Sequence, residues 1–276
     1  RPGGLNTTGV APYKLEARSA LAEVEFVRSL GLEIRTGVQI GRDVSPEALL
    51  AEFDAVFLGP GLGADSRLEA EGAEGAGVHG AVEWIERMKL DPAASVDGVR
   101  RAAVIGGGNT AIDAARELHV VGVPHVTLVY RRRERDMSGY AHEWSAARRE
   151  GIDMIEDALV GAVRRDAAGR PTELALVRAK DGRPTGEALP PLPVDLVLVA
   201  TGQARLRQLA ESFEGVRCDE RGRIIADPET GRTGNPRVYC GGDARNGGKE
   251  VVNAVDEGPR AARAIDAALR AHQHSR

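Results

Sequence analysis

The sequence predicts an α/β protein made of two similar domains, one inserted into the other. The first observation is the stretch from Ala102 to Arg133, which reads as a strand, a glycine turn, an amphipathic helix and a second strand. The second is a repeat. Asp54–Gly61 and Asp195–Gly202 each run from an acid through aliphatic residues to small residues and glycine. Two apolar strands can also match by accident, so the repeat supports two domains without fixing them.

The elements before this stretch follow from hydrophobic spacing and from capping residues. They are a helix over 15–30, a strand over 32–36, a short helix over 46–50, a strand over 53–58 and a helix over 82–90. Ser45 is expected to cap the short helix, because Pro46 follows it at a first helical position. The Gly-, Ala- and Glu-rich residues 63–80 suit a connection, and Asp91-Pro92 marks a domain boundary.

The glycine turn predicts a dinucleotide site. Gly106 permits the tight turn, Gly108 places no Cβ between the backbone and a pyrophosphate, and Ala111 is small enough for the helix to pack on the strand. The pyrophosphate would lie at the N–H groups that begin the helix over 110–118. Three glycines often make only a loop, but a strand before them and a helix after them are the context that the motif requires.

The end of the second strand, His125–Tyr130, indicates which dinucleotide binds. Arg131, Arg132 and Arg133 follow it, and no acid comes before Glu134. An acid at this place accepts the ribose hydroxyls of NAD, whereas an arginine accommodates the 2′-phosphate of NADP. The sequence therefore predicts NADP(H). A solvated basic loop without a ligand is the alternative.

The later chain predicts more strands and a second site. A helix is expected over 143–150, antiparallel strands over 151–163 and 173–178, and strands over 195–200, 223–227 and 238–240. The last strand enters Gly241-Gly242-Asp243, and a helix begins at Val251. Asp243 can accept hydrogen bonds from a polyol, and a helix N-terminus offers donors and positive potential to an electron-rich ring. This pattern is typical of a second cofactor site.

Composition excludes several classes of protein. The 276 residues have room for about two domains. A net charge of −4, with arginines balanced by acids nearly everywhere, gives no reason to expect nucleic acid. No apolar run approaches the roughly 18 residues of a membrane span. Cys218 and Cys240 stand far apart and without metal-ligand spacing, so we expect reduced thiols, no metal and a cytoplasmic protein.

These motifs together resemble the glutamate synthase small-subunit family, which includes the flavin–NADPH domain of dihydropyrimidine dehydrogenase and belongs to the pyridine-nucleotide oxidoreductases. The resemblance rests on the segments at 239–243 and 247–258, on Gly3-Gly4-Leu5 with Lys14, and on the turn at 106–111. It covers essentially the whole chain. It implies that NADPH reduces FAD, and that electrons pass to an iron–sulfur or FMN-containing partner subunit or domain.

The resemblance also implies contacts for individual residues. FAD is expected at Gly4, Leu5, Lys14, Ile40, Gly242, Asp243, Val251, Val252 and Ala254, and NADPH at Gly106, Gly107, Gly108, Asn109, Thr110, Ala111, Arg131, Arg132, Ala200, Thr201 and Gly202. No catalytic residue is expected, because hydride transfer between two cofactors depends on distance, stacking and ring electrostatics. Glu257 is either a carboxylate on the helix surface or a group that tunes the flavin.

The implied fold has two Rossmann-like three-layer nucleotide-binding domains, the NADP domain being inserted into a discontinuous FAD domain. The expected boundaries are 1–80 for a partial FAD segment, 81–98 for a connection, 99–202 for the NADP(H) domain and 203–276 for the return of the FAD domain. The family carries a first FAD-binding βαβ unit and iron–sulfur cysteines upstream of Gly3-Gly4-Leu5. We therefore expect the chain to be a fragment of a longer flavoprotein, truncated at its N-terminus.

Three functions remain open from the sequence. The first is a flavoprotein electron-transfer subunit that oxidises NADPH for a partner. The second is an NADPH-binding module without flavin, because the main FAD pyrophosphate cradle is missing. The third is a free-standing reductase of a quinone, a ferredoxin or a small molecule. The terminal acceptor and the oligomeric state do not follow from the residues.

Overall fold

A computed structural model of the chain describes residues 1–274 and divides it into two compact units. The first unit comprises Arg1–Ile34 and Ala64–Gly202, and the second comprises Arg35–Gly63 and Gln203–Arg276. Residues 64–202 thus interrupt the second unit in sequence, as expected for an inserted domain. The division also places residues 1–34 with the glycine turn, whereas the sequence analysis assigned them to the FAD segment.

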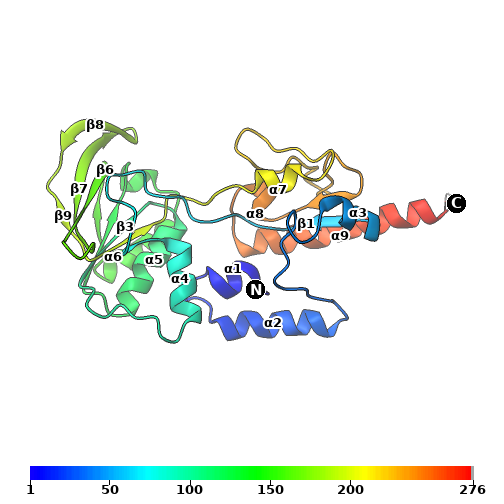
Figure 1. The fold of residues 1–276 in the computed structure, drawn as a ribbon, viewed down its shortest axis with the longest axis horizontal. Helices are drawn as coiled ribbons and strands as arrows, with labels where there is room; N and C mark the ends of the chain where they lie inside the picture. Colours follow the sequence, from blue (N-terminus) through cyan, green and yellow to red (C-terminus); the bar gives the residue numbers. More distant parts are fainter. Residues whose placement is uncertain (275–276) are drawn as a thin grey trace. The chain divides into compact units, whose positions relative to one another are not determined.

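The first unit is built on a parallel sheet of five strands (Figure 1). They are β2 (Val78–Gly80), β3 (Arg101–Ile105), β4 (His125–Val129), β5 (Asp153–Ile155) and β10 (Leu196–Val199), in the order β2-β10-β3-β4-β5. The buried residues of the central strands β3, β4 and β10 are all Val, Ile, Leu or Ala, and these strands are covered on both faces, which is typical of parallel sheets.

Alternate residues of β3 enter two different cores. Ala102 and Val104 contact the core formed with α4 (Ala81–Leu90), α5 (Asn109–Val120) and α6 (Ala141–Arg149). Ala103 and Ile105 point to the opposite face and join the core of an antiparallel sheet. Period-two alternation therefore gives three layers, and each fully buried Val or Leu contributes about 1.5–3 kcal/mol of transfer free energy.

The antiparallel sheet contains β6 (Ala158–Arg165), β7 (Pro171–Lys180), β8 (Arg183–Ala188) and β9 (Leu192–Pro193), with β7 pairing to the other three. The sequence analysis placed residues 151–163 in one antiparallel strand, and this was wrong. Strand β5 pairs in parallel with β4, and β6 begins only after Asp157, whose φ of 49° turns the chain. A short 3-10 turn, η1 (Glu134–Asp136), follows β4.

The N-terminal segment forms α1 (Gly4–Thr8) and α2 (Ala17–Ser29). The strand expected over 32–36 is absent, because no strand in residues 1–274 lies beside this segment to pair with it. Helix α2 buries Ala20, while Phe26 and Leu30 on its predicted apolar stripe are 66% and 73% exposed. The helix was thus predicted correctly, whereas its buried face was not.

The second unit contains the parallel strands β1 (Val56–Leu58) and β11 (Val238–Cys240), with α3 (Pro46–Glu52), α7 (Arg207–Glu211), α8 (Asp243–Asn246) and α9 (Val251–His274). Ser45 caps α3 as expected, since its Oγ accepts a hydrogen bond from the Ala48 N–H at 3.1 Å. The strand expected over 223–227 is reduced to a single bridge between Cys218 and Ile224. A core around Phe213 joins α3, β1, α7, β11 and α8.

Candidate nucleotide-binding sites

Gly106 makes the tight turn at the end of β3. Its φ is 149°, and its N–H donates to the Val129 carbonyl at 3.0 Å. A Cβ at this position would stand 2.4 Å from the Ala200 carbonyl oxygen, nearer than any real contact. Both the backbone conformation and the close approach therefore require glycine, as the motif predicts.

The other two glycines differ in what surrounds them. A Cβ on Gly107 would lie 2.5 Å from the Tyr130 ring, whose hydroxyl donates to the Asp136 carbonyl at 2.8 Å. A Cβ on Gly108 would meet nothing closer than Ser138 Oγ at 3.5 Å. Gly107 is thus needed for packing, whereas Gly108 has room for a Cβ in ordinary contact with Ser138.

Helix α5 begins directly after Gly108. The N–H groups of Ala111 and Ile112 donate to the Gly108 carbonyl at 3.0 and 3.2 Å, but those of Asn109 and Thr110 come too early to have a partner within the helix. Asn109 Oδ1 instead accepts a hydrogen bond from the Tyr140 N–H at 2.8 Å, which fixes the loop before α6 beside the turn. The positive end of a twelve-residue helix therefore lies at the glycine turn, with two backbone N–H donors that the helix itself does not use.

Arg131 and Arg132 follow β4 and are exposed. Neither forms an ion pair within residues 1–274, whereas Arg133 Nε lies 3.2 Å from Asp157 Oδ2. The run of three arginines thus separates into one that stabilises the β4–β6 connection and two whose guanidinium groups are available for a phosphate.

Ala200, Thr201 and Gly202 follow β10 at the same carboxyl edge of the sheet. The Ala200 N–H donates to the Ile105 carbonyl at 2.8 Å, and its own carbonyl is the group that faces Gly106. Gly202 has a φ of 126°, and its carbonyl accepts the Ser66 N–H at 2.9 Å. The structure therefore brings this segment directly beside the glycine turn.

Lys14, an expected flavin contact, already has two carboxylate partners. Its Nζ lies 2.6 Å from Asp113 Oδ1 and 3.0 Å from Glu143 Oε1. Asp113 lies on α5 and Glu143 on α6, so the ammonium ties the N-terminal segment to both helices. Of the neighbouring candidates, Gly4 has a φ of 52° and Leu5 is 39% exposed. The flavin contacts of all three residues stay predictions.

Tyr13 and Arg116 extend this ionic cluster. Arg116 binds Glu150 through Nη2 and Nε at 2.6 and 2.9 Å, reaches Glu143 at 2.5 Å and lies over the Tyr13 ring at 4.7 Å. Burial, followed by the charge of Asp113, raises the pKa of Tyr13. No spacing in the sequence pointed to this cluster, because its members are about a hundred residues apart.

In the second unit, Glu257 organises the turn that carries Gly242 and Asp243. Gly242 has a φ of 67°, and its N–H donates to Glu257 Oε2 at 2.6 Å. Arg245 Nη2 and Asn246 Nδ2 donate to Oε1 at 2.6 and 3.3 Å. Glu257 is only 8% exposed, so it is not a carboxylate on the helix surface. It fixes the turn between β11 and α8.

The charge of Glu257 predicts a stability effect. Burial disfavours that charge, but the hydrogen bonds from Arg245, the Gly242 N–H and Asn246 outweigh burial and hold the pKa of Glu257 below its ordinary 4.5. We expect Glu257→Ala to lower the free energy of unfolding by about 2–4 kcal/mol, because Arg245 loses its partner. The contribution is complete above pH 4.5 and is lost as the pH falls through the depressed pKa.

Denaturation monitored by circular dichroism, together with amide exchange at Gly242, measures this effect. Asp256→Ala is the matched control, since that side chain is exposed and, within residues 1–274, forms its ion pair with Arg260 at 2.6 Å along the helix. It should change the unfolding free energy by less than about 0.5 kcal/mol. Equal effects of the two substitutions would show that the buried carboxylate does not hold the turn.

The remaining flavin candidates lie in the same unit. Asp243 Oδ1 accepts the Lys249 N–H at 3.0 Å, and the Ala254 methyl is 3.6 Å from where a Gly242 Cβ would be. Val251 and Val252 are 46% and 66% exposed at the start of α9. Ile40 packs against the core around Phe213. The start of α9 thus presents exposed apolar side chains, and Ala254 on the same helix lies beside the glycine turn at Gly242.

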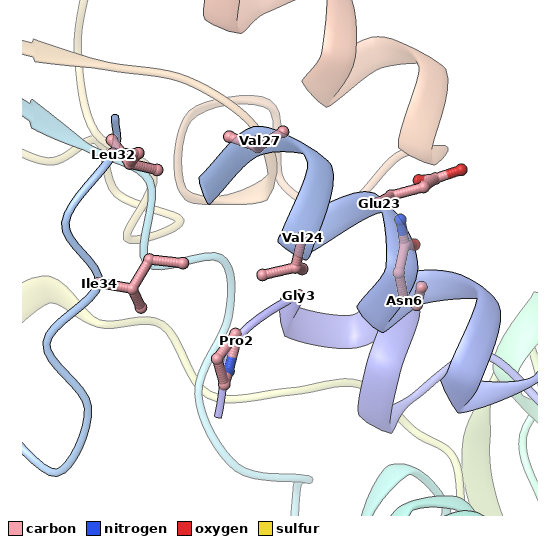
Figure 2. A pocket seen from close by; sticks show the side chains of 9 residues that line it. Pro2, Gly3, Asn6, Glu23, Val24, Val27, Leu32 and Ile34 are labelled. Carbon is pink, nitrogen blue, oxygen red and sulfur yellow. The ribbon is translucent and has the colours of Figure 1, made fainter. Parts of the chain in front are cut away.

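An apolar cavity of about 390 Å³ lies in the first unit, next to the expected flavin contacts Gly4 and Leu5. Figure 2 shows Val24 and Val27 of α2 on the side opposite Leu32 and Ile34, with Pro2 below them in this view. Asn6 and Glu23 are the polar side chains of its lining. Such a lining suits an apolar group rather than phosphates.

Among residues 1–274, no three His, Cys, Asp or Glu side chains are placed to hold a metal ion. None of the helices in that part of the chain has the length and apolar character of a membrane span. Cys218 and Cys240 are free thiols, and burial raises the pKa of Cys240 to about 12. That thiol is therefore uncharged at neutral pH.

Residues 25–258 match the family model described as pyridine nucleotide-disulphide oxidoreductase. The chain belongs to this family. Its members are oxidoreductases, and FAD and NADP(H) are their typical cofactors, which are the cofactors that the sequence predicts. The resemblance to the glutamate synthase small subunit is likewise confirmed.

Two curated relatives illustrate the match. The chain is 32% identical to the glutamate synthase [NADPH] small chain of Escherichia coli K12, over 95% of this chain and 60% of the relative. It is 36% identical to the NADP(+)-dependent formate dehydrogenase subunit beta of Moorella thermoacetica, over 97% and 39%. The chain therefore spans less than two thirds of the length of these two relatives.

Solved structures confirm the two-domain α/β fold. Thioredoxin reductase of T. acidophilum has a TM-score of 0.75 at 22% identity, covering 96% of this chain and 86% of that one. Mycobacterium tuberculosis FprA in complex with NADPH has a TM-score of 0.70 at 19% identity, covering 99% and 76%. At such identities the likeness concerns the fold alone, while the family assignment rests on the sequence matches.

Proposed function

We propose that this member of the pyridine nucleotide-disulphide oxidoreductase family oxidises NADPH, passes the hydride to FAD and sends the electrons on to an iron–sulfur or FMN-containing partner in the cytoplasm. One observation supports the part of this proposal that concerns NADPH binding. Gly108 leaves room for a Cβ at the helix N-terminus, and the two arginines that follow the neighbouring strand have no carboxylate partner within residues 1–274. A pyrophosphate and a 2′-phosphate need this combination.

Each residue has a role in holding the nucleotide. The N–H groups of Asn109 and Thr110 would donate to the pyrophosphate, and the bare Gly108 would let it approach them. Arg131 and Arg132 would hold the 2′-phosphate. Ala200 to Gly202, fixed beside the turn, would border the nicotinamide. The chain's own contribution to hydride transfer is position, without an acid or a base.

The flavin half rests on the second unit. Bound FAD supplies a two-electron acceptor that can release electrons singly. The Gly242 turn presents a φ that only glycine adopts readily, and Glu257 keeps it rigid. Asp243 could then accept hydrogen bonds from the ribityl chain, and Val251, Val252 and Ala254 offer apolar contact to the ring.

Spectroscopy and rapid mixing test the proposal. The purified chain should be yellow, and NADPH should bleach its flavin band under anaerobic conditions. Turnover that requires an added iron–sulfur or FMN-containing protein supports the electron-transfer subunit. Turnover with a quinone alone supports a free-standing reductase. A colourless protein that binds NADPH but takes up no added FAD would instead be a flavin-free module.

A further inference from the structure

The tip of the β7–β8 hairpin lies against the two arginines that follow β4. Asp181 and Gly182 form its two-residue turn, with φ values of 52° and 76°. A Cβ built on Gly182 would stand 3.5 Å from Arg131 Cδ and 3.5 Å from Arg132 Nε. The antiparallel sheet therefore reaches the proposed 2′-phosphate site, although it lies far along the chain from the glycine motif.

The residues on either side of this turn are both cationic. Lys180 and Arg183 face each other across the two strands, so their side chains lie on one face of the hairpin. Both are exposed, and neither forms an ion pair within the described part of the chain. By contrast, Arg178 on the same strand pairs with Glu187 at 2.9 Å. The hairpin tip thus leaves its two outermost cations without a carboxylate.

Four cations that have no carboxylate partner within residues 1–274 therefore come from the two sides of this contact. Arg131 and Arg132 approach it from the end of β4, and Lys180 and Arg183 flank it from the hairpin. Asp181 is the single acid of the turn at 180–183, so the charges there do not cancel. Like charges placed together without a counter-ion repel, and a bound dianion removes that repulsion.

We propose that Lys180 and Arg183 are specificity residues, completing from the hairpin the site for the 2′-phosphomonoester that Arg131 and Arg132 begin. This inference rests on the proposed function. Gly182 lies against the two arginine side chains, and the cations that flank it add an attraction to phosphate that a 2′-hydroxyl cannot use. The hairpin therefore selects the phosphorylated cofactor over NADH.

The double substitution Lys180→Gln with Arg183→Gln tests this role in the full chain. Calorimetric titration should show NADPH affinity falling about 5- to 10-fold, as expected for two exposed charge contacts, while NADH affinity changes less than about twofold. The matched control is Arg170→Gln in the β6–β7 turn, where the lost cation pairs with Asp166 at 2.8 Å. It should leave both affinities unchanged.

Three results would overturn the inference: unchanged NADPH affinity, an equal loss for NADPH and NADH, or the same loss in the Arg170→Gln control. If the double variant unfolds, each single substitution is titrated in its place. Arg131→Met distinguishes a failure of the hairpin role from a failure of the proposed NADPH-dependent function. If it weakens NADPH binding and the hairpin variants do not, only the hairpin role fails; if the wild-type chain does not prefer NADPH, the proposed function fails.

Discussion

Replacing Gly108 by alanine should weaken NADPH binding about 100-fold and leave the fold intact. Gly108 has a φ of −97°, which alanine adopts freely, and the nearest atom to its Cβ would be 3.5 Å away. Stability should therefore change by less than about 0.5 kcal/mol. A methyl group in front of α5 would keep the pyrophosphate away from about two charge-assisted hydrogen bonds, each worth about 1.5–3 kcal/mol.

Gly106→Ala, in contrast, is expected to lower the stability of the fold. The new methyl group would collide with the Ala200 carbonyl at 2.4 Å, at a φ of 149° that alanine avoids. We expect a loss of about 3 kcal/mol in the free energy of unfolding. Trp84 and Trp144 are both buried in the helical core of the first unit, so their fluorescence during denaturation reports on this unit.

The pair of glycine variants separates binding from folding. Calorimetric titration with NADPH and denaturation with urea are carried out on both proteins. If Gly108→Ala binds NADPH as tightly as the wild-type chain, the pyrophosphate does not lie at this turn. If Gly106→Ala is as stable as the wild-type chain, the contact with Ala200 is not as close as the structure has it.

Replacing Arg131 and Arg132 together by methionine should abolish the preference for NADPH. Both guanidinium groups lack carboxylate partners within residues 1–274, so their removal leaves no buried charge behind. We expect NADPH affinity to fall about 100-fold, in line with the loss of two charge-assisted contacts, and NADH affinity to stay within about twofold. Added salt should also weaken NADPH binding more than NADH binding in the wild-type chain.

Arg133→Met is the matched control for this pair. Its guanidinium already binds Asp157 at 3.2 Å, and it follows the same strand with the same charge. It should reduce NADPH affinity by no more than about threefold, because it removes one positive charge from the electrostatic field around the site and no direct contact. A loss as large as that of the double variant would mean that the run acts as an undifferentiated basic loop, the alternative left open by the sequence.

Features that depend on neighbours in the sequence were predictable. The strand, turn and helix around Gly106 follow from apolar spacing over about thirty residues, and the structure confirms all three. The cap at Ser45 is equally local and equally correct. The two-domain α/β class also followed, because glycine turns and apolar strands recur along the chain.

Features that depend on distant partners were not predictable. The segment 32–36 alternates like a strand, but a strand forms only where another strand supplies hydrogen bonds, and none lies beside it in the described chain. The role of Glu257 was left undecided, since the donor Gly242 is fifteen residues away across a turn. The Lys14–Asp113 pair bridges 99 positions, which no spacing rule covers.

The contact between Gly106 and Ala200 has a mechanical consequence. Because one backbone touches the other, the loop that would hold the phosphates cannot shift without pushing the loop that would border the nicotinamide. An extended dinucleotide would then bind to one rigid surface formed by both loops, and not to two loops that move independently. Substitutions that add bulk where the two loops touch, at Gly106 or Ala200, should accordingly be tolerated only in compensating combinations.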